Sequence, residues 1–212
     1  MKRFPFKNGD RIVFQGDSIT DSGWRNDQHK LGDGYVAIIK GFLGTMAPDR
    51  KIEVINRGIS GDRSVDLLLR WEKDVLDLKP THLSVMIGVN DIWRRFDGCV
   101  EKAIALPDYK TNYRRLIEDA LDSGIKHLIL MTPTTVNADP QDESNVMCAE
   151  YAAEVEAFAK EFDAILVPAR DRMWKAVEGG PSVDFWLPDG VHPSIAGHCV
   201  LAEAWLEAVG VI

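Results

Sequence analysis

"RIVFQGDSIT", residues 11–20, joins a short β-branched and aromatic run to a glycine, an acid and a serine. Similar apolar runs recur along the chain, and longer segments separate them. They cover residues 11–15, 52–55, 82–87, 127–131 and 164–167. Because these runs are almost continuously apolar, they predict parallel strands that are buried on both faces of a sheet.

The intervening segments predict helices, because their apolar residues recur at helical spacing. They cover residues 35–46, 64–78, 109–122, 144–161, 170–178 and 194–209. Alternation of strands and helices with short links predicts an α/β doubly wound domain of about five parallel strands with right-handed crossovers. The chain has no internal repeat and no linker, so residues 1–212 are expected to form a single domain.

Composition excludes several classes of partner. The chain has 212 residues, of which 45% are hydrophobic, enough for one domain with a sizeable core. It carries 25 Lys+Arg against 33 Asp+Glu, a net charge of −8. Nucleic acids and anionic membranes are bound mainly through clustered cations, so neither is expected as a partner. No apolar run is long enough to span a membrane.

The amino terminus and the cysteines favour a cytoplasmic protein. The segment "MKRFPFKNGDR", residues 1–11, is charged and no apolar core follows it, so we expect no signal peptide. Cys99, Cys148 and Cys199 are odd in number and far apart, which argues against a disulfide framework or a zinc site. We therefore expect reduced thiols and no bound metal.

Polar residues follow the predicted strands, and ligands bind at the carboxyl ends of strands in open parallel sheets. "GDS" (16–18) follows the first strand, "NRGISG" (56–61) the second, and "GVND" (88–91) the third, while "LPDGVHP" (187–193) precedes the last helix. We expect these four segments to meet at one edge of the sheet.

The residue types in these segments are those that acyl transfer requires. Ser18 needs a base when it attacks a carbonyl, and His192 can accept its proton. Asp189 can orient the imidazole and stabilise the imidazolium that forms. The backbone N–H groups of Ser18 and Gly58 and the side-chain amide of Asn90 can stabilise a tetrahedral oxyanion.

Each segment taken alone has a simpler explanation. Ser18 alone is more typical of a turn or a helix cap, and Gly58 of a turn. Asn90 alone is typical of a loop, and His192 before a proline of an exposed histidine. The hypothesis of a nucleophile therefore depends on the four segments occurring together and in this order.

The four segments resemble the sequence blocks of the SGNH (GDSL-type) hydrolases, and the resemblance spans residues 16–193. It implies a flavodoxin-like three-layer α/β/α sandwich, a triad of Ser18, Asp189 and His192, and oxyanion donors at Ser18, Gly58 and Asn90. "GDSITD", "GVNDIWRRFD" and "HPSIAGH" further resemble the intracellular acetylxylan esterases that deacetylate xylo-oligosaccharides.

The expected function is a serine esterase that removes O-acetyl groups from small carbohydrates through an acyl-enzyme, without a metal or organic cofactor. The candidate substrate contacts are Asp17, Arg63, Trp93 and Trp186. Two alternatives stay open, namely a thioesterase or lysophospholipase for longer acyl chains, and a non-hydrolytic carbohydrate-binding relative. The sequence leaves the oligomeric state open, a homo-oligomer included.

Overall fold

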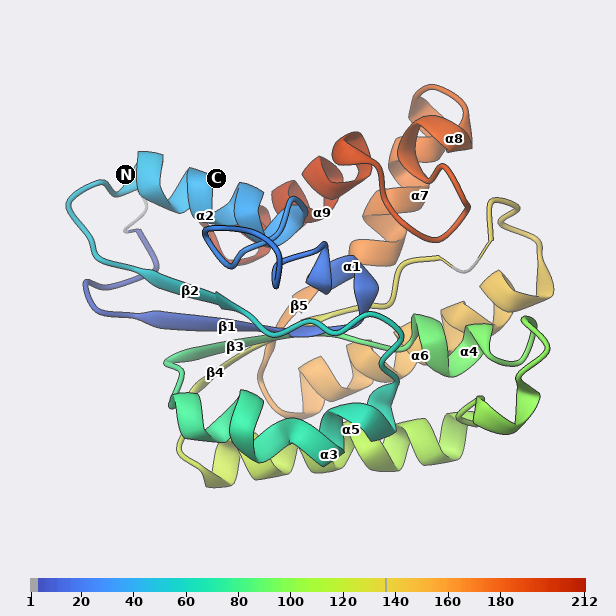
Figure 1. The fold of residues 1–212 in the computed structure, drawn as a ribbon, viewed down its shortest axis with the longest axis horizontal. Coiled ribbons are helices and arrows are strands. Elements are labelled where there is room, and N and C mark those ends of the chain that lie inside the picture. Colours follow the sequence, from blue (N-terminus) through green and yellow to red (C-terminus); the bar gives the residue numbers. More distant parts are fainter. Residues whose placement is uncertain (1–3, 136) are drawn as a thin grey trace.

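The computed structural model describes residues 4–135 and 137–212, and its centre is a five-stranded parallel sheet in the order β2-β1-β3-β4-β5 (Figure 1). The strands are β1 (Arg11–Gly16), β2 (Glu53–Asn56), β3 (His82–Met86), β4 (His127–Met131) and β5 (Ile165–Val167). Every strand lies within one residue of its predicted bounds. The predicted flavodoxin-like α/β fold is therefore confirmed.

Burial along the strands follows their position in the sheet. All residues of the central strand β3 are buried, as are all of β1 except its first residue. The edge strand β2 buries only its last residue fully. Because both faces of the central strands are covered, they show no alternation of polar and apolar residues.

Helices cover both faces of the sheet and make three layers (Figure 1). One face carries α2 (Tyr35–Met46), α7 (Ala169–Gly179) and α9 (Ile195–Ala208). The other carries α3 (Ser64–Asp74), α5 (Leu106–Asp122) and α6 (Glu143–Glu161). Each of these helices lies close to a predicted segment.

The segment 64–78 is the one that the structure divides. Helix α3 ends at Asp74, and a single 3₁₀ turn, η1 (Leu76–Leu78), follows it. Lys79 then adopts a left-handed conformation with φ of 48°. Pro80 disfavours a helical conformation in the residue before it, so the chain leaves the helix here and enters β3.

Three short helices lie in segments that the sequence marks only as links. They are α1 (Ser18–Asp21), α4 (Val89–Trp93) and α8 (Val183–Trp186), and a 3₁₀ turn, η2 (Val100–Lys102), lies between α4 and α5. These elements are too short to show a helical period. Helices α1 and α4 directly follow β1 and β3, the pair between which the order of the sheet reverses, and ligands bind at such a point.

The structure bears only in part on the expectations about membrane spans and about the amino-terminal segment. Within the described residues, no helix combines the length and the apolar character that crossing a membrane requires. Residues 1–3, which belong to the amino-terminal segment, lie outside the described residues.

Candidate active site

Ser18 is the first residue of α1, and only Asp17 separates it from the end of β1. The Asp17 side chain caps this helix by accepting a hydrogen bond from the Ile19 N–H at 3.0 Å. Gly16 permits the sharp turn, because a Cβ there would lie 2.3 Å from the Thr20 hydroxyl and 2.4 Å from the Met86 carbonyl oxygen. The strand end and the cap together fix the direction of the serine side chain.

The Asp17 carboxyl is buried, which changes its acidity. Burial raises the pKa of Asp17 to about 7, although the hydrogen bond from Ile19 opposes the shift. The negative charge of Asp91 raises the pKa further, and His192 lowers it. Asp17 therefore sits beside the nucleophile as a carboxyl that is readily kept neutral.

His192 lies against Ser18 although the two residues are 174 positions apart. The Ser18 Oγ is 2.9 Å from His192 Nε2, and His192 Nδ1 is 2.7 Å from Asp189 Oδ2. The other oxygen of Asp189 accepts the N–H groups of Val191 and His192 at 3.0 and 2.7 Å. The loop between α8 and α9 thus holds the imidazole in one orientation.

The Asp189 carboxylate is suited to stay ionised. Burial would raise its pKa, but the hydrogen bonds from the His192 side chain and from two backbone N–H groups outweigh that effect and lower it. Its side chain is 55% exposed, and that of His192 is 41% exposed. The structure therefore brings Ser18, Asp189 and His192 together in the arrangement that the sequence predicts.

Asn90 lies in α4, one strand away from Ser18 in the sheet. Its side chain is buried, and its Nδ2 donates one hydrogen bond to the Asp62 carbonyl oxygen at 3.1 Å. A primary amide has a second N–H, which remains for another acceptor. The Ser18 N–H belongs to the first turn of α1, where amides have no intrahelical acceptor. Both groups fit the predicted role of oxyanion donors.

Gly58 does not fit that role. Its N–H donates to the Asn56 Oδ1 at 2.9 Å, so it is already bonded within the loop. A Cβ at this position would lie 2.3 Å from the Asp21 nitrogen. Gly58 is therefore a glycine because its loop packs against the backbone of α1, and the predicted oxyanion donor at this position needs correction.

Gly61, three residues later in the same loop, is the better candidate. It adopts a left-handed conformation with φ of +85°, which favours glycine. Its neighbours are held on both sides, since the Ser60 N–H bonds the Asp21 carboxylate at 2.9 Å and the Asp62 carbonyl accepts from Asn90. No acceptor for the Gly61 N–H is found within the described part of the chain.

Two of the four predicted substrate contacts are engaged elsewhere. Asp17 is only 2% exposed and caps α1. The guanidinium of Arg63 pairs with both carboxylate oxygens of Asp66, at 2.8 and 3.1 Å, and donates to the Lys102 carbonyl at 2.7 Å. These bonds assign both residues to the architecture of the site rather than to a substrate.

The two tryptophans differ in their surroundings. The Trp93 ring meets the His192 ring edge to face, with centroids 6.1 Å apart, so it borders the triad. Trp186 packs beside Gly180, where a Cβ would lie 2.8 Å from its ring, and meets Phe185 edge to face at 4.9 Å. Of the two tryptophans, Trp93 is therefore the one beside the triad, and Trp186 fills the junction of α7 and α8.

Sequence reasoning missed Asn56, which organises the approach to the site. Its buried side chain donates to the Thr20 carbonyl at 2.6 Å and the Leu31 carbonyl at 2.8 Å, and accepts from Gly58. An asparagine at the end of a predicted strand is the only signal the sequence offered. Among the described residues, no group of three or more His, Cys, Asp or Glu side chains is arranged to hold a metal ion.

Comparisons with known proteins show which sequences this chain resembles. The model of the GDSL-like Lipase/Acylhydrolase family matches residues 14–200. An acetylxylan esterase from Geobacillus stearothermophilus is 36% identical over 211 residues, which cover 96% of this chain and 95% of the relative.

Solved structures of two proteins are similar to the fold of this chain. The crystal structure of Axe2, an acetylxylan esterase from Geobacillus stearothermophilus, superposes with a TM-score of 0.91 at 36% identity, covering 98% of this chain and 97% of that one. The crystal structure of LAE5, an alpha/beta hydrolase enzyme from the metagenome of Lake Arreo in Spain, superposes with a TM-score of 0.91 at 30% identity and covers 98% of both chains.

Proposed function

The chain belongs to the GDSL-like lipase/acylhydrolase family, and from this premise we propose that it removes O-acetyl groups from carbohydrates, xylo-oligosaccharides above all. It is a carboxylic ester hydrolase. The observation that carries the proposal is the contact of Ser18 Oγ with His192 Nε2 at 2.9 Å, backed by the 2.7 Å contact of His192 Nδ1 with Asp189. The residues 1–212 are proposed to act as one hydrolase domain.

In the first half of the reaction, Ser18 Oγ attacks the acetyl carbonyl carbon while His192 Nε2 takes the hydroxyl proton. Asp189 holds Nδ1–H and stabilises the imidazolium. The carbonyl electrons move onto oxygen, and the tetrahedral intermediate collapses when the C–O bond to the sugar breaks. The sugar oxygen leaves with the proton that His192 returns to it.

The second half releases the acetyl group. A water molecule gives a proton to His192 and attacks the acetyl-serine, and the Ser18 oxygen leaves with that proton. Acetic acid and free enzyme result, and the acid releases its proton to solvent to become acetate, so atoms and protons balance without any further reactant.

The oxyanion of both tetrahedral states needs donors that are already in place. The Ser18 N–H, the remaining amide hydrogen of Asn90 and the Gly61 N–H are the three proposed here. They come from three segments at the point between β1 and β3 where the order of the sheet reverses. Donors fixed before the reaction stabilise developing charge without reorganising.

An acetylated sugar is supported over a long acyl chain by two observations. The Geobacillus stearothermophilus protein, which is 36% identical to this chain, is an acetylxylan esterase. Trp93 lies edge to face against His192, so an apolar ring surface borders the reacting atoms. Sugars present C–H faces that pack on indole rings, and this suits a small acetylated carbohydrate better than a lipid.

The experiment is to measure acetate release from acetylated xylo-oligosaccharides by the protein and by Ser18→Ala. We expect the variant to keep the circular dichroism spectrum and lose turnover. A series of 4-nitrophenyl esters then separates the sugar esterase from a long-chain thioesterase or lysophospholipase. Each methylene that fits an apolar groove contributes about 0.8 kcal/mol of binding free energy. Faster hydrolysis of octanoyl esters than of acetyl esters would therefore refute the proposal.

A further inference from the structure

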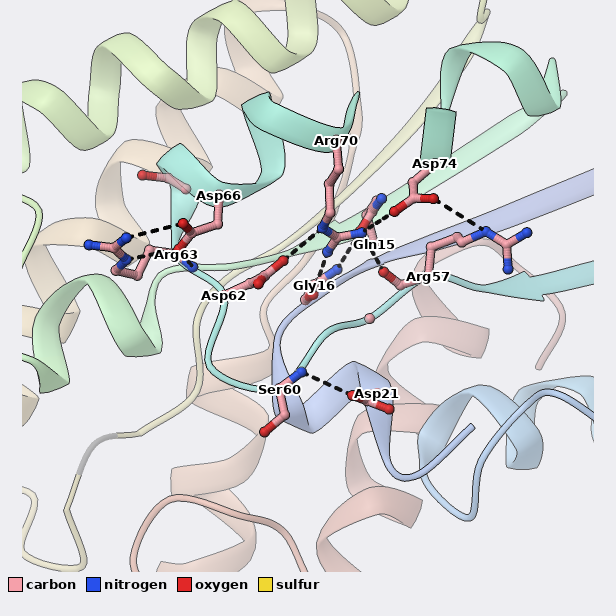
Figure 2. A network of polar contacts seen from close by, with 12 residues as sticks. Gln15, Gly16, Asp21, Arg57, Ser60, Asp62, Arg63, Asp66, Arg70 and Asp74 are labelled. Atoms are coloured by element: carbon pink, nitrogen blue, oxygen red, sulfur yellow. Dashed lines mark hydrogen bonds and ion pairs between the residues drawn. The ribbon is translucent and has the colours of Figure 1, made fainter. Parts of the chain in front are cut away.

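Arg70 lies in α3 and its guanidinium reaches toward the carboxyl end of the sheet (Figure 2). The side chain is only 14% exposed. It donates to four acceptors, which are Asp62 Oδ2 at 2.7 Å, the Arg57 carbonyl at 2.7 Å, Asp74 Oδ2 at 3.0 Å and the Gly16 carbonyl at 3.3 Å. One side chain thus crosslinks three separate segments.

These acceptors bracket the two segments that the proposed reaction uses. Gly16 stands two residues before Ser18, at the end of β1. Arg57 and Asp62 stand at the two ends of the loop that carries Gly61. The Gly16 carbonyl also accepts from the Ile59 N–H at 3.1 Å, so Arg70 reinforces an existing join between the loop and β1.

Asp62 connects Arg70 to the oxyanion side of the site. Its carboxylate is bound by Arg70, and its carbonyl oxygen accepts the Asn90 Nδ2 at 3.1 Å. Gly61 is the adjacent residue in the chain. A shift of Asp62 would therefore move the Gly61 N–H and remove the anchor of the Asn90 amide at the same time.

We propose that Arg70 is a positioning residue that holds the 57–62 loop and the end of β1 in the register at which Ser18, Gly61 and Asn90 meet one oxyanion. The inference rests on the proposed function and extends it to a residue outside the triad. Arg70 touches neither the triad nor a substrate position, and acts through Asp62 and the two carbonyl groups.

The set of acceptors around Arg70 favours an arginine. Four acceptors suit a guanidinium, which presents five N–H donors in a rigid fork, whereas a lysine ammonium has three donors on a flexible stem. Burial raises the pKa of Asp62, and the charge and hydrogen bond of Arg70 oppose that rise. Without Arg70, a partly buried carboxylate would lose its principal counter-charge and would tend to take up a proton or move toward water.

Helix α3 has other contacts that keep it in place. Its own side chains Leu67 and Trp71 are buried against the core. In its first turn, the Ser64 N–H donates to the Asp91 carboxylate at 3.0 Å. At the same end, the Asp66 carboxylate accepts the Arg63 backbone N–H at 2.9 Å. We therefore expect the helix to survive the loss of Arg70, while the loop loses its register.

The test compares Arg70→Met and Arg70→Lys with Arg172→Met. Arg172 is a matched control, because it is also a partly exposed helix arginine with two carboxylate partners, Glu203 and Glu207, and none of these bonds reaches the site. The kinetics of each variant are measured on 4-nitrophenyl acetate and on acetylated xylo-oligosaccharides. The affinity of each variant for methylboronic acid, a transition-state mimic that binds Ser18, is measured as well.

We expect Arg70→Met to lower kcat by about 10- to 100-fold, the size of effect that a misplacement near 1 Å produces, with KM changed less than about twofold. Affinity for methylboronic acid should fall in parallel with kcat/KM. Arg70→Lys should recover part of the loss, and Arg172→Met should match the parent protein. Asp62→Asn should lower kcat in the same way, and the double variant Arg70→Met with Asp62→Asn should lose less than the product of the two single losses.

Three results would overturn the inference. One is an Arg70→Met protein that behaves like the Arg172→Met control. Another is a rise in KM with kcat unchanged, and the third is a double variant whose losses multiply. If Arg70→Met fails to fold, Asp62→Asn carries the test alone, and unchanged kcat in that variant refutes the inference. Retained turnover in Ser18→Ala would instead refute the proposed function, so the two failures are distinguishable.

Discussion

Replacing Asp17 with asparagine should make the free energy of unfolding less sensitive to pH. Asparagine keeps the cap of α1, because its side-chain oxygen can still accept the Ile19 N–H. It removes the buried carboxyl whose pKa burial raises from 3.8 to about 7. At about 1.36 kcal/mol per pKa unit, this shift of about three units corresponds to a stability change of up to about 4 kcal/mol.

The sign follows from which state releases its proton first. Below the unfolded-state pKa the carboxyl is protonated in both states, and folding carries no penalty from this group. As the pH rises, the unfolded chain ionises first, and the stability that the protonated group contributes is lost up to the folded-state pKa of about 7. The stability gap between Asp17→Asn and the parent protein should therefore widen from about pH 4 to about pH 7 and then stay constant.

Urea unfolding of both proteins across this range measures the gap directly. His82 and His198, whose pKa values burial lowers to about 4, titrate in the opposite sense but are common to both proteins, so they cancel in the difference. A gap that does not change with pH would refute the account of Asp17 as a buried, readily neutral cap. A rise in KM for acetyl esters would instead return Asp17 to the role of a substrate contact.

Other predictions concern the oxyanion donors and the sugar platform. Asn90→Ala should lower kcat by about 10²–10³ with little change in KM, and steady-state kinetics that show only a KM increase would remove Asn90 from the oxyanion site. Gly58→Ala should act mainly on stability, because its Cβ would lie 2.3 Å from the Asp21 nitrogen. Gly61→Ala should lower kcat more and stability less than Gly58→Ala, because its left-handed φ strains an alanine but the nearest atom to its Cβ is an Arg94 side-chain nitrogen at 3.6 Å; denaturation and kinetics on the two alanine variants would contradict this if they ranked the other way. Trp93→Ala should reduce turnover of acetylated xylo-oligosaccharides far more than that of 4-nitrophenyl acetate, and equal losses on both would show that the ring serves the triad alone.

The sheet was predictable because parallel strands that are covered on both faces are almost continuously apolar. That constraint places all five strands within one residue, and helical periodicity places the six long helices. Helices α1, α4 and α8 escape this reasoning, because four or five residues contain little more than one turn. Among them only α1 has a side-chain cap, at Asp17, and the others depend on tertiary packing, which local sequence does not encode.

The triad was predictable because strand ends in a parallel sheet meet at one edge, so the residues that follow the strands converge. The choice between two glycines in "NRGISG" was not predictable. It depends on the Asn56 side chain, which folds back and takes the Gly58 N–H, and on the φ of +85° at Gly61. Likewise, Arg63 and Asp17 are polar residues near a site, and only their bonding partners reveal that they serve its architecture.

The most direct test of the central claim is to trap the acyl-enzyme. The protein is mixed with 4-nitrophenyl acetate or acetylated xylo-oligosaccharide, quenched in acid within one turnover, digested and examined by mass spectrometry. The account predicts one acetyl group on the peptide that contains Ser18, and none on any peptide of Ser18→Ala. An acetyl group on another residue, or acetate released by Ser18→Ala at the parent rate, would contradict it.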